Sequence, residues 1–185
     1  MRKLLIALPA LLSLAGCGLL SAEFEIPSVS VTLKSQDFPA VPAGAPLVKE
    51  VNFPIGKDLT GITDKGVTFE LRLTRMAVAL AATSPMGDFG DIESVTVSVL
   101  PPVGQTLPEE AVIASYLKSP ADPNPTSISV AGMSNLDLAP YILSGDLRLK
   151  FVAVSSTGGA IPAWKADVGG VFYLKVHADY LEALN

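Results

Sequence analysis

The stretch "VFYLKVHADY" (residues 171–180) decides the fold class of this 185-residue chain. Apolar residues at the even positions from Phe172 to Ala178 alternate with polar residues at the odd positions from Tyr173 to Asp179. A side-chain period of two is typical of a β-strand in an antiparallel sheet with one buried and one solvent-facing side. We therefore expect Phe172, Leu174 and Val176 in the core, and His177 on the outward side.

The same alternation recurs along the chain, separated by segments rich in proline and glycine. Further strands are predicted at 26–34, 66–74 and 93–100, and less regular ones at 47–55, 112–117, 126–131 and 146–155. Turns or loops are predicted at 39–46, 64–66, 101–108, 120–125 and 156–159. A single helical turn is expected within 134–143, where Ser134 is the predicted cap and Pro140 stops its growth. These elements predict an all-β fold, an antiparallel β-sandwich that is immunoglobulin-like in architecture and has about eight strands.

The strand that begins at 66 changes phase partway along. Its apolar residues are odd-numbered up to Leu73 and even-numbered from Met76 onward, at Val78 and Leu80. A shift by one residue would turn every later side chain to the opposite face of the sheet. Either a β-bulge near Thr74–Arg75 absorbs the shift, or the strand bends from one sheet into the other.

The N-terminus has the three-part layout of a secretory signal peptide. Arg2 and Lys3 precede the apolar run 4–14, and small residues follow immediately before Cys17. The run is too short to span a bilayer, which requires roughly 20 apolar residues. The sequence therefore predicts export, with residues 1–16 removed.

Leu14-Ala15-Gly16-Cys17 resembles the lipobox of bacterial lipoproteins. The resemblance implies that the Cys17 thiol receives a diacylglyceryl group and that a dedicated peptidase cuts before it. It also implies that acyl chains hold the protein on a membrane of the cell envelope. Gly18, rather than Asp, favours the outer membrane over the inner membrane. The expected organisation is a cleaved signal peptide (1–16), an acylated cysteine with a short tether (17–25) and one domain (26–185). An ordinary secretory signal with an incidental cysteine is the alternative.

Cysteine and charge content narrow the functional classes. Cys17 is the only cysteine, so the exported domain folds without a disulfide. Without Arg2 and Lys3, 13 − 2 = 11 basic residues face 18 acidic ones, which leaves a net charge of −7. Such a surface is poorly suited to nucleic acid or to anionic lipid headgroups. We expect membrane contact through acyl chains, and an unknown protein or envelope component as partner.

Three groups of residues were candidates for a site. Asp88, Asp91 and Glu93 lie in a glycine-containing loop, "GDFGDIE" (87–93), and oxygen ligands of this kind suit Ca²⁺. Their spacing does not match an EF-hand, so a solvated loop without metal is the expectation.

The other two candidates are His177 and Trp164. His177 with Asp179 could serve acid–base chemistry, but no nucleophile motif or second histidine accompanies it, so a surface histidine is expected. Trp164 falls in an expected loop, 158–169, where an exposed indole can bind a sugar or a partner and a packed one cannot.

No motif for catalysis, a cofactor or a nucleotide was found, so the expected function is non-catalytic binding or structural support. A carrier for an apolar ligand is one alternative, and it requires a large apolar cavity between the sheets. A hydrolase with an unrecognised site is another, and it requires polar residues converging in a cleft. The only expected non-protein group is the covalent lipid on Cys17.

Overall fold

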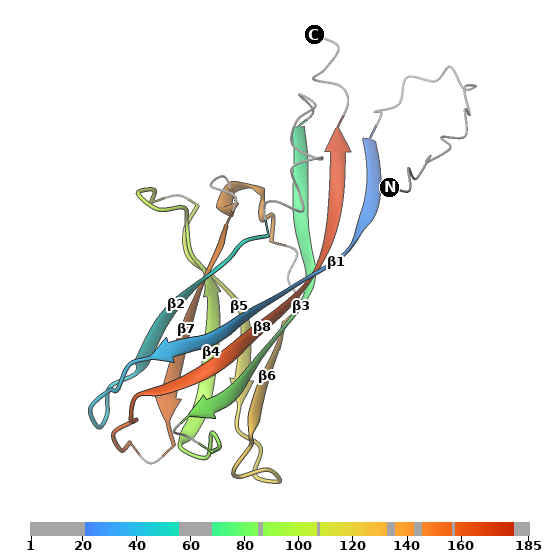
Figure 1. The fold of residues 1–185 in the computed structure, drawn as a ribbon. Helices are drawn as coiled ribbons and strands as arrows, with labels where there is room; N and C mark the ends of the chain where they lie inside the picture. Colours follow the sequence, from blue (N-terminus) through green and yellow to red (C-terminus); the bar gives the residue numbers. More distant parts are fainter. Residues whose placement is uncertain are drawn as a thin grey trace, which may run out of the picture.

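The computed structural model describes residues 21–55, 68–84, 87–106, 108–132, 136–142, 146–156 and 158–179. These residues form eight strands and a short 3₁₀ helix (Figure 1). The elements are β1 (Ser21–Phe38), β2 (Leu47–Phe53), β3 (Thr68–Ser84), β4 (Ile92–Val99), β5 (Ala111–Leu117), β6 (Ser127–Gly132), η2 (Ala139–Tyr141), β7 (Leu147–Ser155) and β8 (Trp164–Asp179). Every predicted strand is present, and the prediction of an all-β fold is confirmed.

The strands form two four-stranded antiparallel sheets, ordered β1-β8-β3-β6 and β2-β7-β4-β5. Among strands consecutive in sequence, only β4 and β5 share a sheet, and each of the others is followed by a strand of the opposite sheet. This is the strand order of an eight-stranded jelly roll. The predicted sandwich is therefore confirmed, but its connections differ from those of an immunoglobulin domain, which pairs its sheets as ABED and CFG.

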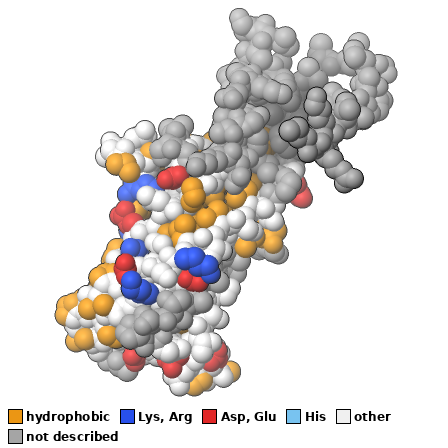
Figure 2. All heavy atoms as spheres, in the orientation of Figure 1, with side chains coloured by type: hydrophobic (Ala, Val, Ile, Leu, Met, Phe, Trp, Pro, Cys, Tyr) orange, Lys and Arg blue, Asp and Glu red, His pale blue; other side chains and the backbone are white. Residues whose placement is uncertain are grey.

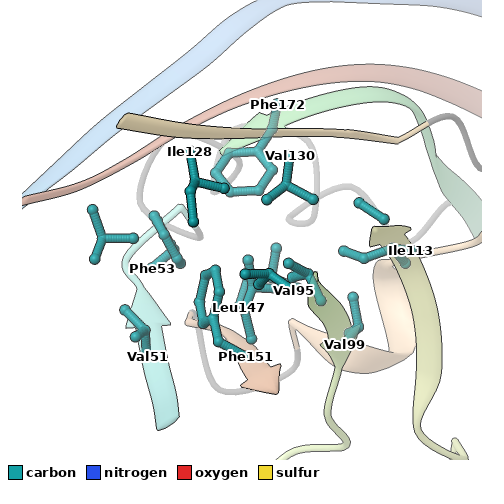
Figure 3. Packing of buried hydrophobic residues seen from close by; sticks show 14 of the residues in the cluster. Val51, Phe53, Val95, Val99, Ile113, Ile128, Val130, Leu147, Phe151 and Phe172 are labelled. Carbon is teal, nitrogen blue, oxygen red and sulfur yellow. The ribbon is translucent and has the colours of Figure 1, made fainter. Parts of the chain in front are cut away.

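The core lies between the inward faces of the two sheets. Phe172 and Ile128 of one sheet face Phe151 and Val95 of the other (Figure 3), and all four side chains are at most 1 % exposed. Burial follows the predicted alternation in β8, where Phe172, Leu174 and Val176 are buried while the odd-numbered residues between them are partly exposed. The period of two therefore identified the buried side of this strand.

The phase change in β3 is a β-bulge. The register between β3 and β8 shifts between Leu73 and Arg75, as the sequence predicts for one of its two alternatives. From Thr68 to Ser84 the strand pairs with β8 throughout and never enters the other sheet. The bulge thus keeps β3 in one sheet, and the alternative of a strand that changes sheets is wrong.

Strand β1 begins earlier than predicted. Residues 21–25, expected to form a tether, belong to β1, where Ser21 is the Cα partner of Asp179. Pairing with the end of β8 provides hydrogen-bond partners for a backbone that alternation alone left unassigned. Together with the start of β3, these strand ends form a three-stranded ribbon that extends beyond the two-sheet body (Figure 1).

The predicted helical turn is reduced to η2, three residues of 3₁₀ helix that include Pro140. Its first residue is preceded by Leu138, which provides no side-chain cap, while the predicted cap Ser134 lies outside the described residues. The expected turn at 64–66 also lies outside them. In the described part of the chain, no helix has the length and apolar character needed to cross a membrane.

Candidate functional site

Trp164 is the first residue of β8, and it is buried. Only 3 % of it is exposed, and its ring is stacked on Phe38 with centroids 3.9 Å apart and an interplanar angle of 3°. Phe89 packs edge-on against the indole at 5.2 Å. The loop position predicted for Trp164 is therefore wrong, and packing is what the structure shows. With Phe38 against one face, the indole offers no open platform for a sugar ring.

Pairing of β1 with β8 creates this aromatic cluster. Phe38 is the Cα partner of Trp164, although the two are far apart in the sequence. Sequence reasoning missed Phe38 because no local pattern indicates which strands become neighbours. The indole Nε1 is buried without a hydrogen-bond partner among the described residues. An open hollow adjoins the cluster, and its rim carries Lys49 and the Asp37–Lys165 ion pair, 3.1 Å long.

The loop that contains Asp88, Asp91 and Glu93 is held together by the protein's own polar groups. Asp88 Oδ1 accepts a hydrogen bond from the Gly90 N–H at 2.9 Å. The Gly90 carbonyl oxygen accepts one from Lys118 Nζ at 2.8 Å, so an ammonium group lies at the loop. Among the side chains that the structure describes, no group of three or more His, Cys, Asp or Glu is placed to hold a metal ion.

The remaining candidates lie in less fully described parts of the chain. His177 is in β8, where its Cα partners are Glu23 on β1 and Glu70 on β3. Its side chain, and that of Asp179, are not described, so their exposure stays a prediction. Cys17 and the signal-peptide segment lie outside the described residues.

The outward faces of the sheets carry ion pairs between neighbouring strands. Figure 2 shows basic and acidic side chains lying beside one another on the visible face. Lys34 Nζ lies 2.6 Å from Asp167 Oδ2, and the Ser35 N–H donates to Asp167 Oδ1 at 2.9 Å. The hydrogen bond from Lys34, and then that from Ser35, lower the pKa of the Asp167 carboxyl. These partners stabilise the charged form of Asp167.

A second network lies on the β2-β7-β4-β5 sheet. Lys150 donates to Glu110, and hydrogen bonds from Lys150 and Ser98 lower the pKa of the Glu110 carboxyl against the opposing effect of burial. Arg148 bridges Glu50 at 2.7 Å and also donates to the Pro101 carbonyl. These contacts connect neighbouring strands and loops, and a structural role accounts for the lowered pKa of Glu110.

The interior near the aromatic cluster is filled. A void of about 10 Å³ lies between the sheets there, and its lining includes Phe38, Phe89, Phe151 and Trp164. A space of this size accommodates about one water-sized probe. This part of the core therefore has no room for an acyl chain or a comparable ligand.

No known protein family matches the sequence, and no curated protein matches it. Among solved structures, turnip yellow mosaic virus is 14 % identical with a TM-score of 0.34, the match covering 97 % of this chain and 91 % of that one. Cocksfoot mottle virus is 11 % identical with a TM-score of 0.36 over 97 % and 94 % of the two chains. The coat protein of tobacco streak virus is 12 % identical with a TM-score of 0.30 over 78 % and 85 %. Similarity at this level does not bear on what the chain does.

Proposed function

We propose that this protein is an envelope lipoprotein, held on a membrane by acyl chains on Cys17, whose β-sandwich binds or supports an envelope component without catalysis. The observation that carries the proposal is the lipobox-like sequence Leu14-Ala15-Gly16-Cys17 after a short apolar run. An acylated cysteine gives stable attachment because two or more chains are buried in the bilayer. The outer membrane is the proposed location.

The position of β1 supports a close attachment. The strand begins at Ser21, four residues after Cys17, so the tether spans at most about 14 Å at full extension. The ribbon formed by the ends of β1, β3 and β8 leads from the tether to the body (Figure 1). An anchored protein would therefore turn the opposite end of the sandwich away from the membrane, with the loops at 39–46 and 158–163.

Among the alternatives, the described core favours a binding or structural role over a carrier. A carrier requires an apolar cavity of some hundreds of Å³, whereas the void lined by Phe38 and Trp164 measures about 10 Å³. A hydrolase requires a nucleophile and a base within hydrogen-bond reach. The polar networks around Asp167 and Glu110 instead join carboxylates to lysines.

The test combines fractionation with cross-linking in the native envelope. Cells expressing the wild-type chain or Cys17→Ser are treated with a short cross-linker, and membranes are separated by density. The wild-type protein should fractionate with the outer membrane and carry one reproducible cross-linked partner, and the Cys17→Ser variant should lose both. If both proteins fractionate alike, the anchor proposal is wrong. If purified wild-type protein instead extracts a stoichiometric apolar ligand, the carrier is the correct function.

A further inference from the structure

The outward face of the ribbon brings histidine and carboxylate residues of three strands together. The register makes His177 of β8 the Cα partner of both Glu23 on β1 and Glu70 on β3. Asp179 follows His177 by two residues and so lies on the same face of the sheet. Directly opposed residues of neighbouring antiparallel strands have Cβ atoms about 4.5–5.5 Å apart. One imidazole and three carboxylates thus share a small area of one sheet face.

From this juxtaposition we propose that Glu23, Glu70, His177 and Asp179 form a binding site for a divalent transition-metal ion, with Zn²⁺ as the representative. Zn²⁺ accepts imidazole nitrogen and carboxylate oxygen at about 2.0–2.2 Å, and four such ligands complete a tetrahedral shell. Only cations that accept nitrogen use the histidine, so the set favours Zn²⁺ over Ca²⁺ or Mg²⁺, which take oxygen ligands.

The charge pattern of the sheet sets this area apart. Elsewhere on its outward face, carboxylates pair with lysines of a neighbouring strand, as Asp167 does with Lys34 and Asp37 with Lys165. In the row of His177, the register opposes both glutamates with histidine instead. The row beyond it contains Ser21, Asp179 and Thr68 and holds no basic residue.

The basic residues near the site lie in the next row, toward the body. Lys175 has Glu25 and Arg72 as its Cα partners there, and its Nζ lies 3.7 Å from Glu25 Oε1. Glu25 therefore offsets one of the two basic charges in that row. The proposed site, with three carboxylates and a neutral imidazole, keeps a net negative charge that attracts a divalent cation.

A bound ion would join β1, β8 and β3 where the chain leaves for Cys17. Because its ligands come from three strands, ion binding would oppose fraying of the ribbon ends. The site is independent of acylation, so it does not depend on the proposed function. It requires only the strand register.

Titration calorimetry with ZnCl₂ on the full chain in detergent tests the proposal. We expect one Zn²⁺ per chain, a melting temperature that rises on addition of Zn²⁺, and binding more than about tenfold weaker in His177→Gln and in Glu70→Gln. Binding should also weaken as the pH falls from about 7.5 to about 5.5, because protonated imidazole cannot bind a metal. Calcium should not compete at equal concentration.

Two control variants separate this site from other causes. Glu25→Gln, which lies on the same face outside the set, should leave the affinity unchanged. Cys17→Ser should also bind Zn²⁺ normally, and a loss of binding in that variant alone would assign the ion to the thiol and overturn the proposal. Absence of binding to the wild-type chain would overturn it as well. So would a pH-dependent melting temperature that follows His177 but does not respond to Zn²⁺. Far-UV circular dichroism establishes that each variant folds.

Discussion

The indole of Trp164 and the ring of Phe38 lie parallel, 3.9 Å apart, at the point where the last residue of β1 meets the first residue of β8. Phe89 closes the edge of this stack. The cluster therefore joins a loop of one end of the sandwich to the pairing of its two longest described strands, and it buries the only tryptophan of the chain.

The first prediction concerns this cluster. Trp164→Ala should reduce the free energy of unfolding by about 3–5 kcal/mol, since it removes a buried aromatic side chain and leaves a cavity. Leu117→Ala, at a residue that is 71 % exposed, should change it by no more than about 0.5 kcal/mol. Urea unfolding followed by circular dichroism measures both. Emission of the wild-type tryptophan should be blue-shifted and poorly quenched by acrylamide, and efficient quenching would contradict the burial of Trp164.

The second prediction tests which side of β8 is buried. Phe172→Ala should cost about 3–5 kcal/mol, because Phe172 is fully buried and packs edge-on against Phe53 at a centroid distance of 5.4 Å. In the presence of a chelator, His177→Ala should cost no more than about 0.5 kcal/mol. Thermal unfolding compares the two. A greater loss of stability in His177→Ala would mean that the outward side of the strand had been misassigned.

A glycine at the sandwich edge gives the third prediction. A Cβ on Gly132 of β6 would lie 2.0 Å from the carbonyl oxygen of Ile113 on β5, which is backbone and cannot move aside cheaply. Gly132→Ala should therefore destabilise the protein by more than about 1 kcal/mol. Gly87→Ala is the control, since no atom lies within 4 Å of its Cβ position. Equal urea midpoints for the two variants would refute the close approach of β5 and β6.

The fourth prediction concerns pH. The pKa of Asp167 is lowered chiefly by the hydrogen bond from Lys34, so the folded protein binds fewer protons than the unfolded chain in the acid range. The resulting stabilisation is present above the ordinary carboxyl pKa and is lost as the pH falls through the lowered one. Lys34→Met should therefore reduce stability slightly at neutral pH and flatten its decline below about pH 4. Urea midpoints across this range measure the effect, and parallel curves for variant and wild type would contradict it.

The fifth prediction concerns the anchor. Cys17→Ser should abolish incorporation of a radiolabelled fatty acid and stop cleavage before residue 17, because the hydroxyl cannot form the thioether. Leu19→Ala, which leaves Leu14 to Cys17 intact, should be labelled and processed like the wild type. Metabolic labelling followed by gel electrophoresis detects both events. Label on the serine variant, or none on the wild type, would exclude acylation of Cys17.

The sequence by itself determined the number and nature of the strands. Alternation in 171–180 and 93–100 identified Phe172 and Val95 as core residues, because the period of two is a property of each strand alone. The phase change near Arg75 likewise predicted a local irregularity, and the register of β3 against β8 shows which form it takes.

Only the tertiary structure decided which strands are neighbours. The stack of Phe38 on Trp164, the approach of Gly132 to Ile113 and the row of Glu23, His177 and Glu70 all depend on pairings between distant segments. Strand patterns fit an immunoglobulin-like sandwich and a jelly roll equally well, because both place alternating apolar faces against each other. The choice between them follows from the packing of the whole core and the length of each connection, which no single strand encodes.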